Sequence, residues 1–422
     1  MTMEEEGATP LDHNHLHKQL LPNNVFLTIA KSFLDNPDDV FHLALSSKSL
    51  WRYLEDEIYA TEVLTTKASA EMLVRGTPDA EVVINVHQSD IPDPVERLRL
   101  FKLRPNFQEH RSLLLRIIDD GNTEAARKLI NASVENWPNY LDVKRRSVTP
   151  LFLALMHGHE KIVEYLVNGG CFVDAWYDEP WGIRKFVKGG CQFIKELEVK
   201  SSCYNKADNI IYSLLDYAIA MRRHDQSLLL AKYTCDGGLI PVEENTTHMP
   251  PLHLAAFGGM THVVRTLLER GYDSFAPSNL FNNATPLDMA ASGVDNNQKT
   301  MQLLIDSREE LPGPITARKR ALIHRALIHR APGNAIFLLE TWHQIQQLSN
   351  LKDEVTYCLE SDELLPVLQW IVEHDQSTTI RQDIKSMCLK LIDKKKGIES
   401  GTMKYLRSVG IMEPSSDQDH DR

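Results

Sequence analysis

The chain has 422 residues, enough for two or three domains with a substantial apolar core. Its 46 basic and 58 acidic side chains give a formal net charge of −12 at pH 7, so the surface as a whole would repel nucleic acid and anionic membranes. Hydrophobic residues at 42% and charged residues at 25% are ordinary for a globular protein, and they exclude a fully disordered chain and a fibrous one.

The N-terminal residues 1–19 are polar and predict a disordered tail. Acidic residues stand at positions 4 to 6, where a secretory signal needs basic ones, and no stretch approaches the 18 apolar residues of a membrane span. We therefore expect an intracellular protein, cytoplasmic and/or nuclear, without a membrane segment. The 6 cysteines form no C-x-x-C pair, and we interpret them as reduced thiols rather than disulfides or zinc ligands.

Residues 20–60 predict three short helices. Apolar side chains at positions 25, 26, 29, 33 and 34 follow helical spacing, and Asn36-Pro37-Asp38-Asp39 ends that pattern. A second amphipathic helix is expected over 40–45, and a third begins within 46–51.

This three-helix pattern resembles an F-box. The residues that carry the resemblance are Leu21, Pro22, Ile29, Leu34, Pro37, Asp39, Leu43, Ser46 and Lys48. In that family the motif docks on the Skp adaptor of a cullin ubiquitin ligase. The resemblance implies that the adaptor-binding residues are Leu21, Pro22, Ile29, Leu34 and Leu43. The residues themselves also allow a purely structural role, in which the helices cap the repeats that follow.

Residues 61–110 are interpreted as a connector that sets the angle between the N-terminal helices and the rest of the chain. Ile91-Pro92-Asp93-Pro94 marks a bend, and residues 95–103 predict a short helix.

From residue 111 to 410 the sequence repeats in units of two predicted helices. The clearest unit spans 250–273, and units that start at Thr149-Pro150 and Thr285-Pro286 share its pattern; Pro251 and Pro286 lie 35 residues apart. Threonine caps the first helix, proline fits its first turn, and a central glycine reverses the chain into the second helix. Weaker units fall at 113–130, 213–231, 322–339, 355–372 and 384–409.

These units resemble ankyrin repeats, whose period is about 33 residues. The resemblance implies an all-α fold, an ankyrin helical solenoid preceded by a small F-box-like segment. It also implies a structural role for His253, at a position where the family commonly has a histidine that bonds a helix start. A short disordered tail is expected over 411–422.

The interval between two neighbouring repeat units is longer than one repeat period. Pro150 and Leu214 lie 64 residues apart, which places an insertion at about 175–210 that is rich in aromatic residues. The sequence leaves open whether these aromatic side chains pack on the neighbouring repeats or form a partner-binding finger through Trp176 and Trp181. Between two helix pairs, the apolar residues predicted to contact a partner, or else to pack on the adjacent finger, are Phe275, Leu280 and Phe281.

No catalytic, cofactor or metal residues are assigned. His157-Gly158-His159-Glu160 lacks the second histidine of a zinc helix because position 163 is valine, and no phosphate loop or nucleophile elbow occurs. The duplicated Arg-Ala-Leu-Ile-His at 320–324 and 325–329 makes a basic segment, as does 394–396. We expect a solvated face there; steering of an acidic partner or a nuclear signal are the alternatives.

The sequence therefore predicts a non-catalytic adaptor for protein–protein interaction, without cofactor and without direct nucleic-acid binding. By resemblance it is a substrate receptor of a cullin-RING (SCF-type) ubiquitin ligase, whose partners would be the Skp adaptor, the cullin ligase core and an unidentified target. The alternative is an ankyrin-repeat scaffold that acts as a transcription co-regulator in the nucleus.

Overall fold

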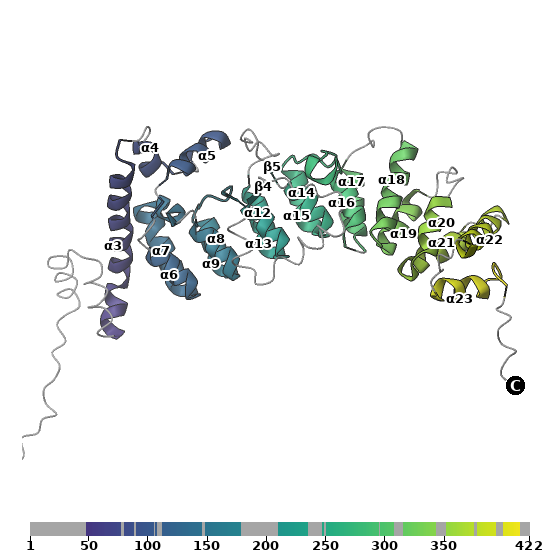
Figure 1. Ribbon diagram of the computed structural model, residues 1–422. Coiled ribbons are helices and arrows are strands. Elements are labelled where there is room, and N and C mark those ends of the chain that lie inside the picture. The colour runs from purple at the N-terminus through teal and green to yellow at the C-terminus, as the bar shows by residue number, and fades with distance from the viewer. Residues whose placement is uncertain are drawn as a thin grey trace, which may run out of the picture.

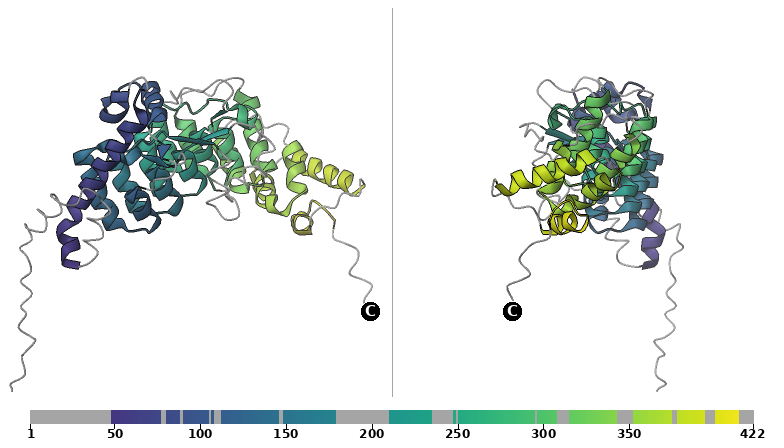
Figure 2. Two further views of the ribbon diagram at one scale, coloured as in Figure 1. Left: turned by 60° about the vertical axis from the view of Figure 1, so that its left-hand side comes forward. Right: turned by 90° about the vertical axis from the view of Figure 1, so that its right-hand side faces the viewer.

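A computed structural model describes residues 48–413 except 77–79, 88–89, 105, 108–111, 146–147, 179–209, 235–246, 249, 295, 308–314, 343–351, 375–377 and 394–399. The helices stand side by side in one row from the N-terminal to the C-terminal end (Figure 1), and the row bends into an arch when it is turned (Figure 2). One continuous apolar core runs along it from Ile58 to Ile411. The predicted all-α solenoid is confirmed.

The row consists of helix pairs, each joined by a tight turn. They are α6 (Leu113–Asp119) and α7 (Thr123–Asn136); α8 (Pro150–His157) and α9 (Glu160–Asn168); α12 (Leu214–Ala220) and α13 (His224–Tyr233); α14 (Pro251–Phe257) and α15 (Thr261–Glu269); α16 (Pro286–Ser292) and α17 (Gln298–Asp306); α18 (Ile315–Ile328) and α19 (Pro332–Trp342); α20 (Lys352–Leu359) and α21 (Leu365–His374), with the 3₁₀ helix η6 (Asp362–Leu364) between them. The row ends with α22 (Thr378–Asp393) and α23 (Ser400–Ser408). All eight units expected from the sequence contain two helices.

In six of the pairs, from α6–α7 to α18–α19, the turn places one residue in the left-handed region. Glycine occupies it at Gly158 and Gly259, where φ is 79° and 68°. The unit that lacks a central glycine uses Arg222 at φ 55°, and the next degenerate unit uses Arg330 at φ 54°. The apolar stripes therefore impose the turn even where a side chain raises its energy by about 1 kcal/mol.

The N-terminal helices belong to the same body. α3 (Lys48–Val74) begins where a third helix was expected, but it continues without a break across residue 60, where the sequence placed a boundary. Its buried side chains lie toward α7, and Glu55 forms an ion pair with Lys128 of α7. The connector contains α4 (Ala80–Asn85) and α5 (Pro94–Leu103), and α5 matches the helix expected over 95–103.

Two small sheets, which the sequence did not indicate, lie along one edge of the row. β1 (Asn106–Phe107) pairs in parallel with β2 (Lys144–Arg145), which follows the 3₁₀ helix η3 (Pro138–Asp142). β4 (Ile210–Ser213) pairs with β3 (Trp176–Asp178) in antiparallel fashion and with β5 (Thr247–His248) in parallel.

Three of the cysteines lie in the described ranges, and each is a buried free thiol: Cys171, Cys358 and Cys388. Burial raises the pKa of Cys358 to about 12 and that of Cys388 to about 11, so both stay protonated and unreactive. Within the described part of the chain, every helix is too short or too polar for a bilayer span.

Candidate interaction surfaces

The finger between α15 and α16 buries its apolar side chains. Phe275, Leu280 and Phe281 are 6%, 2% and 0% exposed, so the expectation that they form an exposed partner contact is wrong. The loop folds back on itself, because Ser278 N–H donates to the Ala284 carbonyl at 3.0 Å. The structure instead agrees with the alternative interpretation, in which these three side chains pack inside the protein.

The folded-back loop depends on two asparagines and one histidine. Asn282 and Asn283 adopt φ of 50° and 59°, a conformation that asparagine tolerates, and both are exposed at the finger tip. The ring of His253 stacks on Phe281 with 5.9 Å between centroids, and its Nε2 donates to the Ala284 carbonyl at 3.1 Å. Burial lowers the pKa of His253 to about 4, which keeps the ring neutral. His253 thus has the structural role expected of it, and the finger presents amides to solvent.

The aromatic insertion is closed at its base by the second sheet. Trp176 stands at the start of β3 opposite Ser213 of β4, so the two ends of the insertion are hydrogen-bonded neighbours. Trp181 lies outside the described residues, as do all the adaptor-docking residues: Leu21, Pro22, Ile29, Leu34 and Leu43. The proposed contacts of these side chains remain predictions.

The duplicated basic segment in α18 is paired with acidic residues on both sides. Arg320 Nε lies 2.9 Å from Oε1 of Glu354 in α20, and His324 Nε2 lies 3.0 Å from the same oxygen. In the other direction Arg325 Nε lies 3.4 Å from Oδ1 of Asp288 in α16. Glu354 and Asp288 are 1% exposed, whereas the side chains of Arg320, His324 and Arg325 are 38%, 27% and 26% exposed, so the expected solvated face is here only partly solvated and ion-paired. They fasten three successive repeats together.

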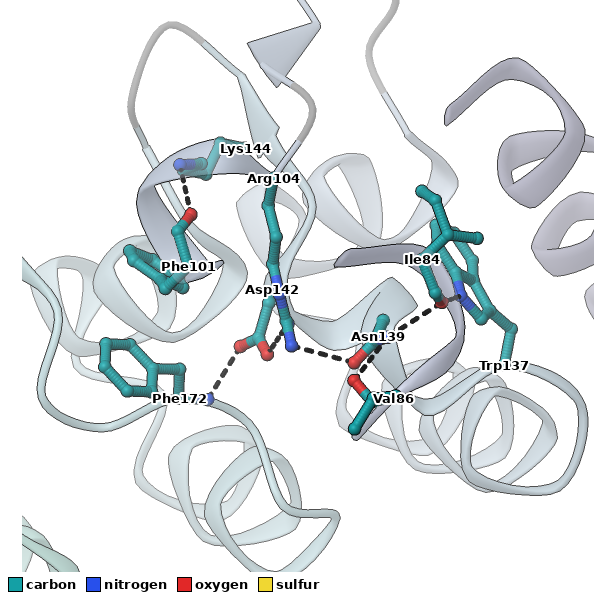
Figure 3. A network of polar contacts seen from close by, with 9 residues as sticks. All are labelled: Ile84, Val86, Phe101, Arg104, Trp137, Asn139, Asp142, Lys144 and Phe172. Carbon is teal, nitrogen blue, oxygen red and sulfur yellow. Dashed lines mark hydrogen bonds and ion pairs between the residues drawn. The ribbon is translucent and has the colours of Figure 1, made fainter. Parts of the chain in front are cut away.

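A second buried polar network joins the N-terminal helices to the repeats (Figure 3). Arg104, at the end of α5, pairs with Asp142 of η3 and donates to Asn139 Oδ1 at 2.8 Å. Asp142 also accepts from the Phe172 N–H at 2.7 Å, just beyond α9. The side chains of the Arg104–Asp142 pair are 6% and 2% exposed, and breaking such a pair leaves an uncompensated buried charge. The connector is therefore fixed to two repeats at once.

The same network satisfies backbone carbonyl groups at the ends of short helices. Trp137 Nε1 donates to the Ile84 carbonyl at 2.6 Å, and Asn139 Nδ2 donates to the same carbonyl at 2.9 Å. The Lys144 ammonium donates to the Phe101 carbonyl at 2.8 Å and lies 4.6 Å from the ring centroid of Phe101. Burial lowers the pKa of Lys144 to about 8. These hydrogen bonds satisfy carbonyl groups at the C-terminal ends of α4 and α5 that have no partner within the helix.

The outer helices carry a shallow hollow of about 690 Å³ between α13, α15 and α17. Apolar side chains such as Leu228 and Leu303 line it beside Arg265, Lys299 and Asp306. Because both signs of charge border it, its chemistry selects no particular ligand. Among the described residues no three His, Cys, Asp or Glu side chains converge as a metal site; His157 stacks on His159 and lies 3.3 Å from Asp119.

The comparison with protein-family models agrees with the helix pairs described above. The ankyrin repeat family model matches residues 148–176 and 248–279, which contain α8–α9 and α14–α15. The crystal structure of the human ASB11 ankyrin repeat domain aligns with 55% of this chain and 83% of its own length, at 17% identity and a TM-score of 0.33. No curated protein sequence shows a significant match.

The class of protein follows from the fold and the repeats. This is an ankyrin-type helical solenoid, and its ankyrin repeats indicate a protein–protein interaction domain. Proteins with such repeats are generally interaction scaffolds rather than enzymes.

Proposed function

We propose that this protein is a non-catalytic adaptor whose N-terminal segment, residues 20–60, docks on the Skp adaptor of a cullin-RING ubiquitin ligase, while the repeats hold a target for ubiquitylation. The docking contacts are Leu21, Pro22, Ile29, Leu34 and Leu43. Trp176 and Trp181 of the insertion are the proposed target contacts.

The course of α3 is the observation that supports this proposal most. α3 starts at Lys48, inside the F-box-like segment, and ends at Val74, so one helix of 27 residues joins the docking segment to the repeats. At 1.5 Å per residue it is about 40 Å long. It does not behave as a hinged linker, because Tyr59, Val63 and Ala70 are buried in its contact with α7.

A helix held against the repeats from residue 48 onward suits a substrate receptor, because it limits how far the docking residues can move relative to the repeats. A ligase transfers ubiquitin to lysines within reach of its catalytic subunit, so a receptor works best when it holds the target in a fixed relation to the docking site. The ion pair between Glu55 and Lys128 and the Arg104–Asp142 pair both resist rotation of α3–α5 against the repeats.

Binding to purified Skp adaptor tests the proposal. The wild-type chain should be retained on immobilised adaptor, and Leu21→Asp with Pro22→Ala should abolish retention. Leu389→Asp is a matched control, because Leu389 is a half-exposed leucine in α22 at the far end of the row. Absence of wild-type binding, or equal binding by the double variant, would reject the ligase function. Proximity labelling dominated by chromatin proteins would then favour the nuclear co-regulator.

A further inference from the structure

The first helix of the row has an apolar face that the described part of the chain leaves uncovered. α3 lies at one end, with α7 on one side and no described element on the other (Figures 1 and 2). On that outer side Leu64 is 49% exposed and Met72 is 76% exposed. Leu73, beside Met72, is 57% exposed. Leu64 and Met72 stand about two turns apart on this side, whereas Leu73 points about 100° round the helix from Met72.

The centre of this outer side carries no charge from Thr61 to Met72, although the exposed Glu71 borders it and the exposed Arg75 follows one turn after Met72. Thr61, Leu64, Thr65, Ala68 and Met72 follow one another at spacings of three and four residues, which places them on one side of the helix. Leu64, Thr65, Ala68 and Met72 are all exposed. We define these five residues as the outer face of α3. A solenoid needs a polar end or a cap at its first unit, and this face is uncharged, with two threonines among its apolar side chains.

The chain itself supplies a segment that matches this face. Residues 1–47 lead directly into α3, and within them positions 25, 26, 29, 33 and 34 form the apolar stripe of an expected helix. A helix over 25–34 is about 15 Å long, and Leu64 and Met72 lie about 12 Å apart along α3. Lys31 is the only charged residue in 25–34, so packing there would strand no charge against an uncharged face.

The connection is long enough for the segment to fold back. Leu64 lies about 24 Å along α3 from Lys48. The thirteen residues 35–47 span up to about 43 Å when extended. If residues 40–45 are helical, as their pattern predicts, the span is still about 32 Å. An antiparallel arrangement then places residue 34 near Leu64 and residue 25 near Met72.

We propose that residues 25–34 form an amphipathic helix that packs on the outer face of α3 and closes the N-terminal end of the solenoid. This contact is intramolecular and goes beyond the adaptor function. Ile29 and Leu34 cannot face α3 and a Skp adaptor at the same time, so under the proposed function, docking displaces the segment from α3.

Oxidation of Met72 in the adaptor-free full chain tests the contact directly. Hydrogen peroxide converts an accessible methionine to its sulfoxide, and peptide mass spectrometry follows each methionine separately. If the covered state is favoured about tenfold, Met72 should oxidise about tenfold more slowly in wild type than in Ile29→Asp with Phe33→Asp, where a charged stripe cannot pack. Ile29→Leu with Phe33→Leu keeps the apolar stripe and should keep the protection.

Two internal measurements keep the result interpretable. Met289, which is 1% exposed in α16, should oxidise slowly in every variant, which shows that the repeats stay folded. Ala68→Arg places a long charged side chain in the middle of the outer face without weakening the helix, and it should release Met72 as the double variant does.

Three outcomes would overturn the proposal. Met72 could oxidise as fast in wild type as in the double aspartate variant, or it could stay protected in that variant. Protection that grows with protein concentration would instead place a second copy of the chain on the outer face. Since no adaptor is present, the result is independent of whether the ligase function holds.

Discussion

Asp216 and Asp288 form a natural comparison between a buried carboxylate without a cation and one with a cation. Both occupy the third position of an inner helix and close a capping box. Oδ2 of Asp216 accepts from the Ser213 N–H and Oγ, each at 2.7 Å, and Oδ2 of Asp288 accepts from the Thr285 N–H and Oγ1, each at 2.8 Å. Oδ1 of Asp288 lies 3.4 Å from Arg325, whereas Oδ1 of Asp216 has no hydrogen-bond partner among the described residues.

Because Asp216 has no cationic partner among the described residues, its protonation makes the stability of the folded state depend on pH. Burial is the largest influence and raises its pKa from 3.8 to about 7, although the two bonds from Ser213 act against it. Between pH 4 and 7 the folded chain therefore holds a proton on Asp216 that the unfolded chain has lost. Stability gained from this residue rises as the pH falls from 7 to 4, and a shift of about 3 units corresponds to about 4 kcal/mol.

Substitution of Asp216 by asparagine isolates that contribution, because the amide oxygen can still accept from Ser213 and the side chain no longer titrates. We expect the unfolding free energy of wild type, minus that of Asp216→Asn, to increase by about 4 kcal/mol between pH 8 and pH 4. Urea unfolding followed by circular dichroism at several pH values measures it, and all other titrating groups cancel in the difference. Asp288→Asn is the comparison variant: it removes the ion pair with Arg325 and should lower stability relative to wild type. A wild-type-minus-Asp216→Asn difference that stays flat from pH 8 to pH 4 would refute the reasoning.

Three further substitutions probe single junctions between repeats. Asn334→Ala should lower stability by about 2–4 kcal/mol in thermal unfolding, because its Nδ2 donates to the Val294 carbonyl at 2.9 Å and its Oδ1 accepts from the Asn297 N–H at 2.7 Å in a fully buried site; unchanged stability would contradict this. Arg104→Ala should cost about 3–5 kcal/mol by leaving Asp142 buried without its cation, and hydrogen exchange should quicken in α4 and α5 rather than throughout the row. Glu354→Gln should quicken hydrogen exchange in α18 and α20, since Arg320 and His324 lose their common anion; equal exchange in both chains would count against the ion-pair role.

The helix pairs could be predicted from the sequence because their signals are local. Threonine caps, first-turn prolines and central glycines fall within a few residues of one another, as at Thr149, Pro150 and Gly158. For Phe281 the sequence left partner contact and packing both open, because its burial depends on a loop that doubles back. A local signal existed even there, since the consecutive Asn282 and Asn283 tolerate the left-handed backbone that the reversal uses.

To predict the ion-pair partners of the basic segment, one needs the repeat period rather than a local sequence pattern. Arg320 and His324, which open and close the first copy of the duplicated pentapeptide, lie one turn apart on α18. Their shared partner Glu354 stands 34 residues after Arg320, and Asp288 stands 37 residues before Arg325, so each acid lies about one repeat away. Aligning the degenerate units in register would have shown the opposite charges facing each other. The two small sheets and the Arg104 network gave no such signal, because they join segments of irregular length.

Each polar junction joins only neighbouring helix pairs. A change at one end of the molecule should therefore leave the other end unaffected. Glu55 meets Lys128 at the N-terminal end, Asn297 and Asn334 lock the middle of the row, and Asp362 accepts from the Thr402 N–H at 2.8 Å near the C-terminal end. Because each unit contacts only its neighbours, a lost junction lowers the stability of the adjacent units far more than that of distant ones. Loosening α18–α20 should therefore leave α3 and its outer face unchanged. Retention of normal Met72 oxidation in Glu354→Gln would support this separation, and faster oxidation there would show that the row responds as a whole.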